Sequence, residues 1–230
     1  MISLLENSVF FGSLLSLFAY MIGEFLKKKT GKAFMNPLLI SIILVIIVLK
    51  VLKIDYQSYN DGAKYISYLL TPSTVALAIP LYKQFELLKK NTAAILSGIL
   101  SGAVTSFITV LVLSVLFRFS HKEYVTFLPK SITTAIGMGI SEELGGFVPI
   151  TVAVIIITGI FGNVISSAVF KLFRINEPVA KGVSLGTASH AIGTAKAMEL
   201  GEVKGAISSL SIVICGIFTV FGVMLFEKLY

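Results

Sequence analysis

Three long stretches of this 230-residue chain carry no charged side chain, and they constrain its fold more than any other feature. They run from Thr92 to Phe117, from Leu144 to Phe170 and from Gly205 to Phe226. A helix that crosses the hydrocarbon core of a bilayer needs about 20 apolar residues, so each stretch predicts a membrane span. The composition, with 56% hydrophobic and 13% charged residues, argues against a water-soluble fold.

Other apolar segments predict further helices. Asn7 to Gly23 and Ala33 to Leu49 are shorter uncharged runs whose flanking polar or basic residues can reach the membrane surface, and Tyr65 to Tyr82 is a sixth candidate span. The sequence therefore predicts an all-α polytopic membrane protein with about 6–8 transmembrane elements. We expect a single integral membrane domain over 1–230, with N-terminal helices in 1–60 and a repeat region in 61–230.

Clustered lysines give the expected orientation. Four of them, Lys27, Lys28, Lys29 and Lys32, follow the first predicted helix. Because cytoplasmic loops carry an excess of Lys and Arg, this loop is predicted inside and the N-terminus outside a cell (plasma) membrane. No basic region precedes the first apolar run, which favours a retained helix over a cleaved signal peptide. The net charge of +7 is explained by basic loops facing an anionic lipid bilayer, so no nucleic-acid partner is expected.

Two polar, glycine-rich segments, 128–146 and 185–202, form an internal repeat with a displacement of 56 residues and no gap. The identical positions are Ala135, Ile136, Gly137, Glu143, Leu144 and Gly145 in the first copy and Ala191, Ile192, Gly193, Glu199, Leu200 and Gly201 in the second. A fainter third copy starts at Pro72. A long apolar span follows each copy, and tandem units of this kind are typical of transporters.

The glycines Gly137, Gly139 and Gly193 predict helix breaks inside these segments, which either cross the membrane or re-enter it. A broken helix leaves backbone groups unpaired, and lipid cannot satisfy them, so such backbone is expected to line a wet cavity. The N-termini of half-helices suit an anion such as a carboxylate. Hydroxyl side chains that can partner the backbone and a substrate there are Ser131, Thr133, Thr134, Thr187, Ser189 and Thr194.

Two lysines in the repeat are candidate partners of a substrate carboxylate. Lys130 follows Pro129 at the start of the first segment, and Lys196 lies inside the second. A buried charge in a membrane is costly unless it is used or paired. The alternatives are an interfacial position for both, or an ion pair between Lys196 and Glu199 three residues later.

His190, Glu143 and Glu199 are candidates for ion or proton coupling. Thr187 and Thr194 share a face with His190 if the chain is helical there, and an imidazole titrates near physiological pH, so His190 is also a candidate substrate ligand. The alternative for His190 is a structural hydrogen bond to a neighbouring carbonyl. For the two glutamates, the alternative is capping of the next helix or simple solvation.

Enzyme chemistry has no support in the sequence. Ser189 and His190 are adjacent, so their side chains point apart on a helix and cannot act as a nucleophile and its base. The sequence contains no nucleophile elbow, paired-histidine zinc motif or phosphate loop. Cys215 is the only cysteine, so neither a disulfide nor a cysteine metal cluster is possible within the chain. We therefore expect no catalytic activity, no metal and no cofactor.

The same residues resemble a known family. The motifs LPKSITT at 128–134, ELGG at 143–146 and LGTASHAIGTAKAMELG at 185–201, with ALAIPLY at 76–82, are similar to the LrgB/CidB family of integral membrane proteins. The resemblance covers the chain from about residue 60 to its end. One departure is Ala135, where the family pattern has proline after the paired threonines.

The resemblance implies two alternative functions. Bacterial members are described as antiholin-like or holin-like modulators of murein hydrolase activity and autolysis, encoded beside a small LrgA/CidA-type membrane partner. A plastid relative is a glycolate/glycerate translocator, and some bacterial pairs are linked to pyruvate uptake. These descriptions agree if the shared activity is ion-coupled transport of small monocarboxylates by alternating access, in a homo-oligomer. The alternative is an antiholin-like regulator that acts through oligomerisation and its partner, and residues such as Gly98 and Gly102, which suit helix interfaces, fit both.

Overall fold

The computed structural model describes residues 10–31, 35–76 and 78–230, and within these ranges every regular element is helical. The chain divides into two compact units, Met1–Ala76 and Leu77–Tyr230. The start of the predicted run at Asn7, Lys32 of the lysine cluster and Ala33 lie outside the described residues. The helical content of the described residues confirms the predicted all-α polytopic membrane protein.

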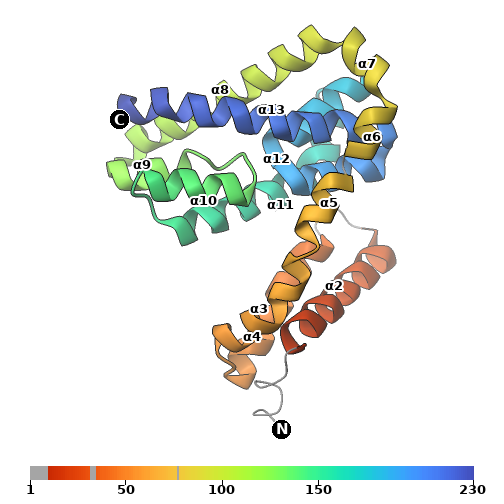
Figure 1. The fold of residues 1–230 in the computed structure, drawn as a ribbon, viewed down its shortest axis with the longest axis vertical. Helices are drawn as coiled ribbons and strands as arrows, with labels where there is room; N and C mark the ends of the chain where they lie inside the picture. The colour runs from red at the N-terminus through yellow and green to blue at the C-terminus, as the bar shows by residue number, and fades with distance from the viewer. Residues whose placement is uncertain (1–9, 32–34, 77) are drawn as a thin grey trace. The chain divides into compact units, whose positions relative to one another are not determined.

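The N-terminal unit contains helices α2 (Phe11–Thr30), α3 (Pro37–Leu52), α4 (Tyr56–Ser67) and α5 (Leu70–Ala76) (Figure 1). Helix α2 packs closely against α4, because Gly12 has no side chain to hold the backbone of Tyr59 and Ala63 away. The Ser16 hydroxyl shares a 2.7 Å hydrogen bond with the Tyr59 hydroxyl across this contact. The candidate span Tyr65 to Tyr82 is not one long helix: α4 ends at Ser67, and the short helices α5 and α6 (Ala78–Lys83), which contain Pro72 and Pro80, follow it.

The C-terminal unit contains all three helices that are long and apolar enough to cross a membrane among the described residues. These are α8 (Thr92–Phe117), α11 (Val148–Leu172) and α13 (Glu202–Phe226), which a 3₁₀ turn (Glu227–Leu229) extends. They confirm the three predicted spans. The remaining elements are α6 (Ala78–Lys83), α7 (Phe85–Lys90), α9 (His121–Phe127), α10 (Thr134–Glu143) and α12 (Pro178–Leu200).

Helices α9 and α10 form a hairpin, hairpin 1 (121–143), that turns back at residues 128–133 (Figure 1). Its open end lies at the start of α11, where the Phe147 amide donates to the Thr126 hydroxyl at 2.8 Å. The Thr151 hydroxyl donates to the Thr126 carbonyl at 2.9 Å and to Ser141 at 2.7 Å, which ties both arms to α11. A capping box starts α9, and hydrogen bonds from Ser120 lower the pKa of Glu123.

Helix α12 is a second hairpin, hairpin 2 (178–200), rather than a continuous helix. Its backbone breaks at His190, which has φ 41° and ψ −130°. The returning arm packs on the outgoing arm, because Leu185 and Ala197 lie in one apolar cluster with Phe170 of α11. The open end of hairpin 2 therefore lies beside the end of α11, whereas the open end of hairpin 1 lies beside its start. The two hairpins enter the helical unit from opposite ends.

The repeat register holds in three dimensions. Gly137 and Gly193 are equivalent positions in the two copies, and each faces the carbonyl of the residue eight positions earlier, Pro129 or Leu185. In addition, Ile136 packs on Gly216 of α13, while its equivalent Ile192 packs on Gly159 of α11. Each hairpin thus contacts the span that follows the other hairpin. A repeat unit contains one hairpin and one span, so the two copies have inverted topology.

The predicted breaks exist, but not at the predicted glycines. Gly137 and Gly139 lie within continuous α10, and Gly193 lies within the returning arm of α12. The chain reverses instead at 128–133 and at His190. Gly193 is needed for close approach of the two arms of hairpin 2, because a side chain there would collide with Leu185 and Ser189. Gly137 packs instead against Ile155 of α11.

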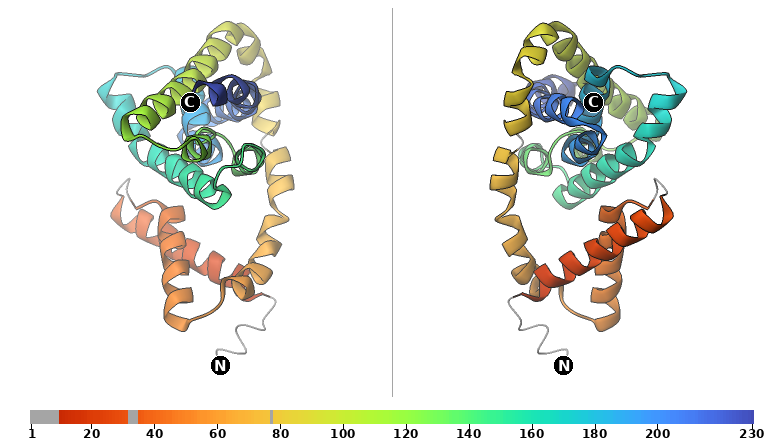
Figure 2. Two further views of the ribbon diagram at one scale, coloured as in Figure 1. Left: turned by 90° about the vertical axis from the view of Figure 1, so that its left-hand side faces the viewer. Right: turned by 90° about the vertical axis from the view of Figure 1, so that its right-hand side faces the viewer.

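The two ends of the C-terminal unit differ in charge. One end carries the starts of α8 and α13 and the end of α11, and a 3.6 Å ion pair between Lys83 and Glu202 joins α6 to it. At this end the basic residues outnumber the acidic ones. The basic residues are Lys83, Lys89, Lys90, Lys171, Arg174, Lys181 and Lys204. The opposite end holds the C-terminus, where the Tyr230 hydroxyl donates to the Phe119 carbonyl beside the end of α8 (Figure 2). We call the first the basic end.

Candidate functional site

The tips of the two hairpins meet near the midpoints of the three spans. Ser131 of hairpin 1 shares a 3.1 Å hydrogen bond with Ser106 of α8. The Cys215 thiol of α13 lies 4.0 Å from the carbonyl of Ser131 and 3.8 Å from that of Thr187. Ser131 and Thr187 are equivalent positions of the repeat, so the inverted copies bring matching residues to one point.

A cavity of about 770 Å³ adjoins this point, between α8, α11 and α12. It extends from Asn91 and Glu177 at the basic end to Lys130 at the tip of hairpin 1. Its polar lining residues beyond these are Ser101, Thr105, Ser106, Thr109, Ser131, Thr158, Ser184, Thr187 and Ser189. Hydroxyl groups share the lining with apolar side chains such as Phe161, Ile165 and Val183, and its charged side chains are Lys130 at the inner end and Glu177 at the basic end.

Lys130 is half-buried, and its ammonium group donates to the Ser131 hydroxyl at 3.1 Å. No ion pair joins Lys130 to an acidic residue in the described part of the chain. The buried Thr187 hydroxyl also has no hydrogen-bond partner there. An ammonium group without an acidic partner and a hydroxyl without a hydrogen-bond partner, both in one cavity, are suited to bind an anion, because unpaired buried polar groups are costly.

Glycines on α8 and α11 let hairpin 2 approach the cavity. Gly102 of α8 faces the Thr187 side chain, where a Cβ would lie 2.7 Å from its methyl group. On α11, Gly162 leaves room for the Ser189 side chain. The predicted interface pair Gly98 and Gly102 thus packs α8 against hairpin 2 within one chain and lines the cavity.

The structure brings some predicted site residues to the cavity and places others outside its lining. Lys130, Ser131, Thr187 and Ser189 line it. Those outside the lining are Thr133, Thr134, His190, Thr194, Lys196, Glu143 and Glu199. Thr133 and Thr134 begin α10, with no hydrogen bond from the N-cap side chain, and the Thr194 hydroxyl shares a 2.7 Å hydrogen bond with Ser208 of α13.

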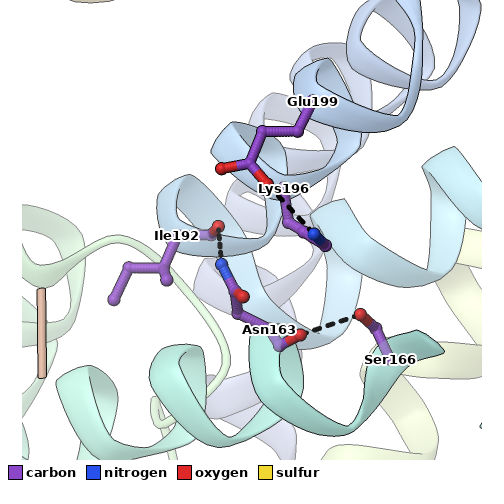
Figure 3. Close-up of polar contacts among 5 residues, drawn as sticks. All are labelled: Asn163, Ser166, Ile192, Lys196 and Glu199. Carbon is purple, nitrogen blue, oxygen red and sulfur yellow. Dashed lines mark hydrogen bonds and ion pairs between the residues drawn. The ribbon is translucent and has the colours of Figure 1, made fainter. Parts of the chain in front are cut away.

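Lys196 and Asn163 stabilise the returning arm of hairpin 2 (Figure 3). The Lys196 ammonium forms a 3.0 Å ion pair with Glu199, the structural alternative that the sequence left open. Asn163 of α11 donates to the Ile192 carbonyl at 3.2 Å, just beyond the break. The Asn163 hydrogen bond ties α11 to the returning arm just beyond the break, whereas the Lys196–Glu199 pair lies within that arm. Neither Asn163 nor Lys196 lines the cavity.

His190 is buried at the break, and its Nε2 donates to the Ile155 carbonyl of α11 at 3.0 Å. Its imidazole ring packs against Gly159, where a Cβ would lie 2.7 Å from Cε1. A positive φ is rare for a residue with a side chain and costs about 1–3 kcal/mol. The surrounding contacts therefore hold His190 in a strained backbone conformation beside the cavity residue Ser189.

Glu143 is exposed at the open end of hairpin 1, away from its tip.

The hydroxyl stripe of α8 was not predicted. Ser101, Thr105 and Thr109 recur every four residues and line the cavity. The signal is present in the sequence as polar residues with helical spacing inside an otherwise apolar span.

Comparison with known proteins agrees with this picture. The profile of the LrgB-like family matches residues 16–229. The antiholin-like protein LrgB of Bacillus cereus (strain B4264) is 39% identical over 218 residues, which cover 94% of this chain and 95% of that protein. The antiholin-like protein LrgB of Bacillus anthracis (strain CDC 684 / NRRL 3495) matches with the same identity and coverage. No solved structure matches the chain. This multi-pass membrane protein belongs to the LrgB-like family.

Proposed function

We propose that this protein transports small monocarboxylates, of the pyruvate, lactate, glycolate or glycerate class, by alternating access. The observation that carries the proposal is the cavity at the meeting point of two oppositely entering hairpins, with Lys130 at its inner end. Inverted repeats with broken helices and a site near the membrane midplane are the shared design of many secondary transporters. A volume of about 770 Å³ accommodates a three-carbon acid with its hydration water.

In this proposal the Lys130 ammonium balances the substrate carboxylate, and the hydroxyls of Ser131, Thr187 and Ser189 hydrogen-bond to it or to the neighbouring oxygen. The unpartnered Thr187 hydroxyl supports this assignment, since a substrate would supply its missing partner. A 2-oxo or 2-hydroxy group offers a second polar atom beside the carboxylate. The hydroxyl stripe of α8 is placed to bind that atom and to hydrate the path toward the basic end.

The orientation follows from the charge difference between the two ends. Because Lys and Arg are retained on the cytoplasmic side, we infer that the basic end faces the cytoplasm of a cell whose plasma membrane holds the protein. The cavity then extends toward the cytoplasm, which corresponds to an inward-facing state. The same rule, applied to Lys27, Lys28 and Lys29, puts the N-terminus outside. The inverted repeat supplies the outward-facing state if the hairpins exchange conformations.

Ion coupling is proposed for His190, whose strained backbone connects the Ser189 hydroxyl in the cavity to α11. Protonation of a buried imidazole changes which atoms it can bond, and such a change at a hinge shifts the balance of two conformations. Glu143 and Glu199 stay secondary candidates, because the first is exposed and the second pairs with Lys196.

Uptake by the purified protein in liposomes tests the transport proposal. We expect saturable uptake of at least one of pyruvate, lactate, glycolate and glycerate, with competition among them and none by a neutral analogue such as acetone. An inward proton or sodium gradient should raise the initial rate if transport is coupled to that ion. Absence of saturable flux for all four acids, both alone and with a small LrgA/CidA-type partner, would reject the proposal.

A second candidate is an antiholin-like membrane regulator of murein hydrolase activity and autolysis, acting through homo-oligomers and a small LrgA/CidA-type partner. The observation that favours it is the name of its relatives in two Bacillus species. The two candidate functions can be distinguished in cells that depend on this protein for control of lysis. A regulator keeps that control when Lys130 is replaced and uptake is lost, whereas a transporter whose flux causes the phenotype loses both.

A further inference from the structure

A second cavity, of about 320 Å³, lies at the basic end and is separate from the candidate transport site. It is formed where α11 ends, α12 begins and returns, and α13 starts. Its lining residues are Ser167, Phe170, Lys171, Ile175, Asn176, Lys181, Leu200 and Lys204. It shares none of these with the central cavity, so it needs a separate explanation.

Three lysines from three helices face this pocket. The Lys204 ammonium donates to the Leu200 carbonyl at 2.7 Å, and that of Lys181 lies 5.7 Å from the centre of the Phe170 ring. None of the three forms an ion pair with an acidic residue of the described chain. Three like charges around a small pocket repel one another unless an anion is bound between them.

The acidic residues near the pocket do not neutralise it. Glu202 pairs with Lys83, and Glu199 pairs with Lys196. Glu177 lines the central cavity instead. The positive charge of the pocket is therefore available to a ligand.

The apolar part of the lining narrows the class of ligand. Phe170, Ile175 and Leu200 contribute a hydrophobic wall, while Ser167 and Asn176 add neutral hydrogen-bonding groups. The pocket also lies at the ends of two helices long enough to span a membrane, which is the depth of lipid headgroups. A basic, partly apolar pocket between membrane helices at this depth fits a phosphate that carries acyl chains.

We propose that this pocket binds the phosphate of an anionic phospholipid headgroup. The phosphate lies between Lys171, Lys181 and Lys204, and the glycerol and acyl carbons lie against the apolar wall. Bound there, the lipid bridges α11 to both arms of hairpin 2 at its open end. The expected consequence is a hairpin 2 that is stabilised by anionic lipid whether or not the protein transports anything.

Thermal unfolding of the full chain in detergent micelles, with added lipid, tests the proposal. We expect phosphatidylglycerol to raise the midpoint of unfolding, and phosphatidylcholine to have no comparable effect. The triple variant K171Q/K181Q/K204Q should bind phosphatidylglycerol about a hundredfold more weakly, since a lysine near a phosphate contributes about 1 kcal/mol. The matched control K50Q/K90Q/K228Q loses the same charge at exposed positions outside the pocket and should bind as the wild type does.

Two other results overturn the proposal. Equal loss in the two triple variants means that lipid responds only to net charge. Full stabilisation by inorganic phosphate, which also blocks the lipid effect, means that the pocket holds a free anion. If the glutamine variant does not fold, K171R/K181R/K204R replaces it: retained lipid binding supports a phosphate site, and loss of binding by a folded arginine variant contradicts it.

Discussion

If this protein transports monocarboxylates as proposed, replacing Lys130 by glutamine should reduce their uptake at least about thirtyfold at low substrate concentration. Loss of one partner from a desolvated charge pair costs about 2–5 kcal/mol, and every 1.4 kcal/mol is a factor of ten in affinity. The substrate carboxylate then has only neutral hydroxyls around it. Initial uptake rates in liposomes, measured over a range of substrate concentrations, check this result. The arginine variant keeps the charge and should retain part of the activity.

Lys196 is the matched comparison for Lys130. Both lysines lie in the repeat, but Lys196 pairs with Glu199 at 3.0 Å and lies outside the cavity lining. We therefore expect K196Q to change uptake less than about threefold, because an ion pair of this kind stabilises by only about 0–1 kcal/mol. If K196Q abolishes uptake and K130Q does not, the assignment of the substrate site is wrong.

Replacing Gly193 by alanine destabilises the protein strongly, although glycine-to-alanine changes inside helices normally stabilise. The added Cβ would lie 2.6 Å from the Ser189 Cβ and closer still to the Leu185 carbonyl, so the two arms of hairpin 2 must separate. Overpacking of this kind costs about 1–3 kcal/mol or more. The midpoint of thermal unfolding should fall by about 2–12 °C in a chain of this size.

Gly139 supplies the control for Gly193. It lies within helix α10, and nothing lies within 4 Å of the position of an added Cβ. Alanine there should leave the midpoint unchanged or raise it, since alanine is favoured over glycine in a helix by about 1 kcal/mol. Equal midpoints for the two variants would show that the arms of hairpin 2 do not pack as described.

The sequence predicted the membrane class, the three spans and the repeat because these depend on local composition and spacing. The sequence did not predict the end from which each hairpin enters the C-terminal unit. Reversal at His190 depends on tertiary contacts with Ile155 and Gly159 of α11 that have no counterpart in the neighbouring sequence. Gly193 is visible in the sequence, but its contact with Leu185, eight residues earlier, exists only once the arms of hairpin 2 are packed.

The same limit applies to the candidate site. Lys130 and Lys196 are both candidate ligands by residue type, and the apolar residues on both sides of Lys196 favoured it over Lys130. The fold separates the two lysines, since the tip of hairpin 1 carries Lys130 to the cavity while the returning arm of hairpin 2 carries Lys196 to Glu199. The hydroxyl stripe of α8 was predictable from its four-residue spacing. That it lines a cavity was not predictable, because this depends on the elements that face α8 in the fold.

Reaction of a single introduced thiol in the cavity tests the central claim most directly. Ser101 lines the cavity, is exposed and bonds only to the Gly98 carbonyl of its own helix, so S101C in a C215A background places a thiol there without breaking a contact between helices. A charged, membrane-impermeant thiol reagent should modify it from the side of the basic end, and pyruvate or a related acid should slow the modification in a saturable way. Unchanged modification at every concentration of all four acids would contradict a carboxylate site in this cavity.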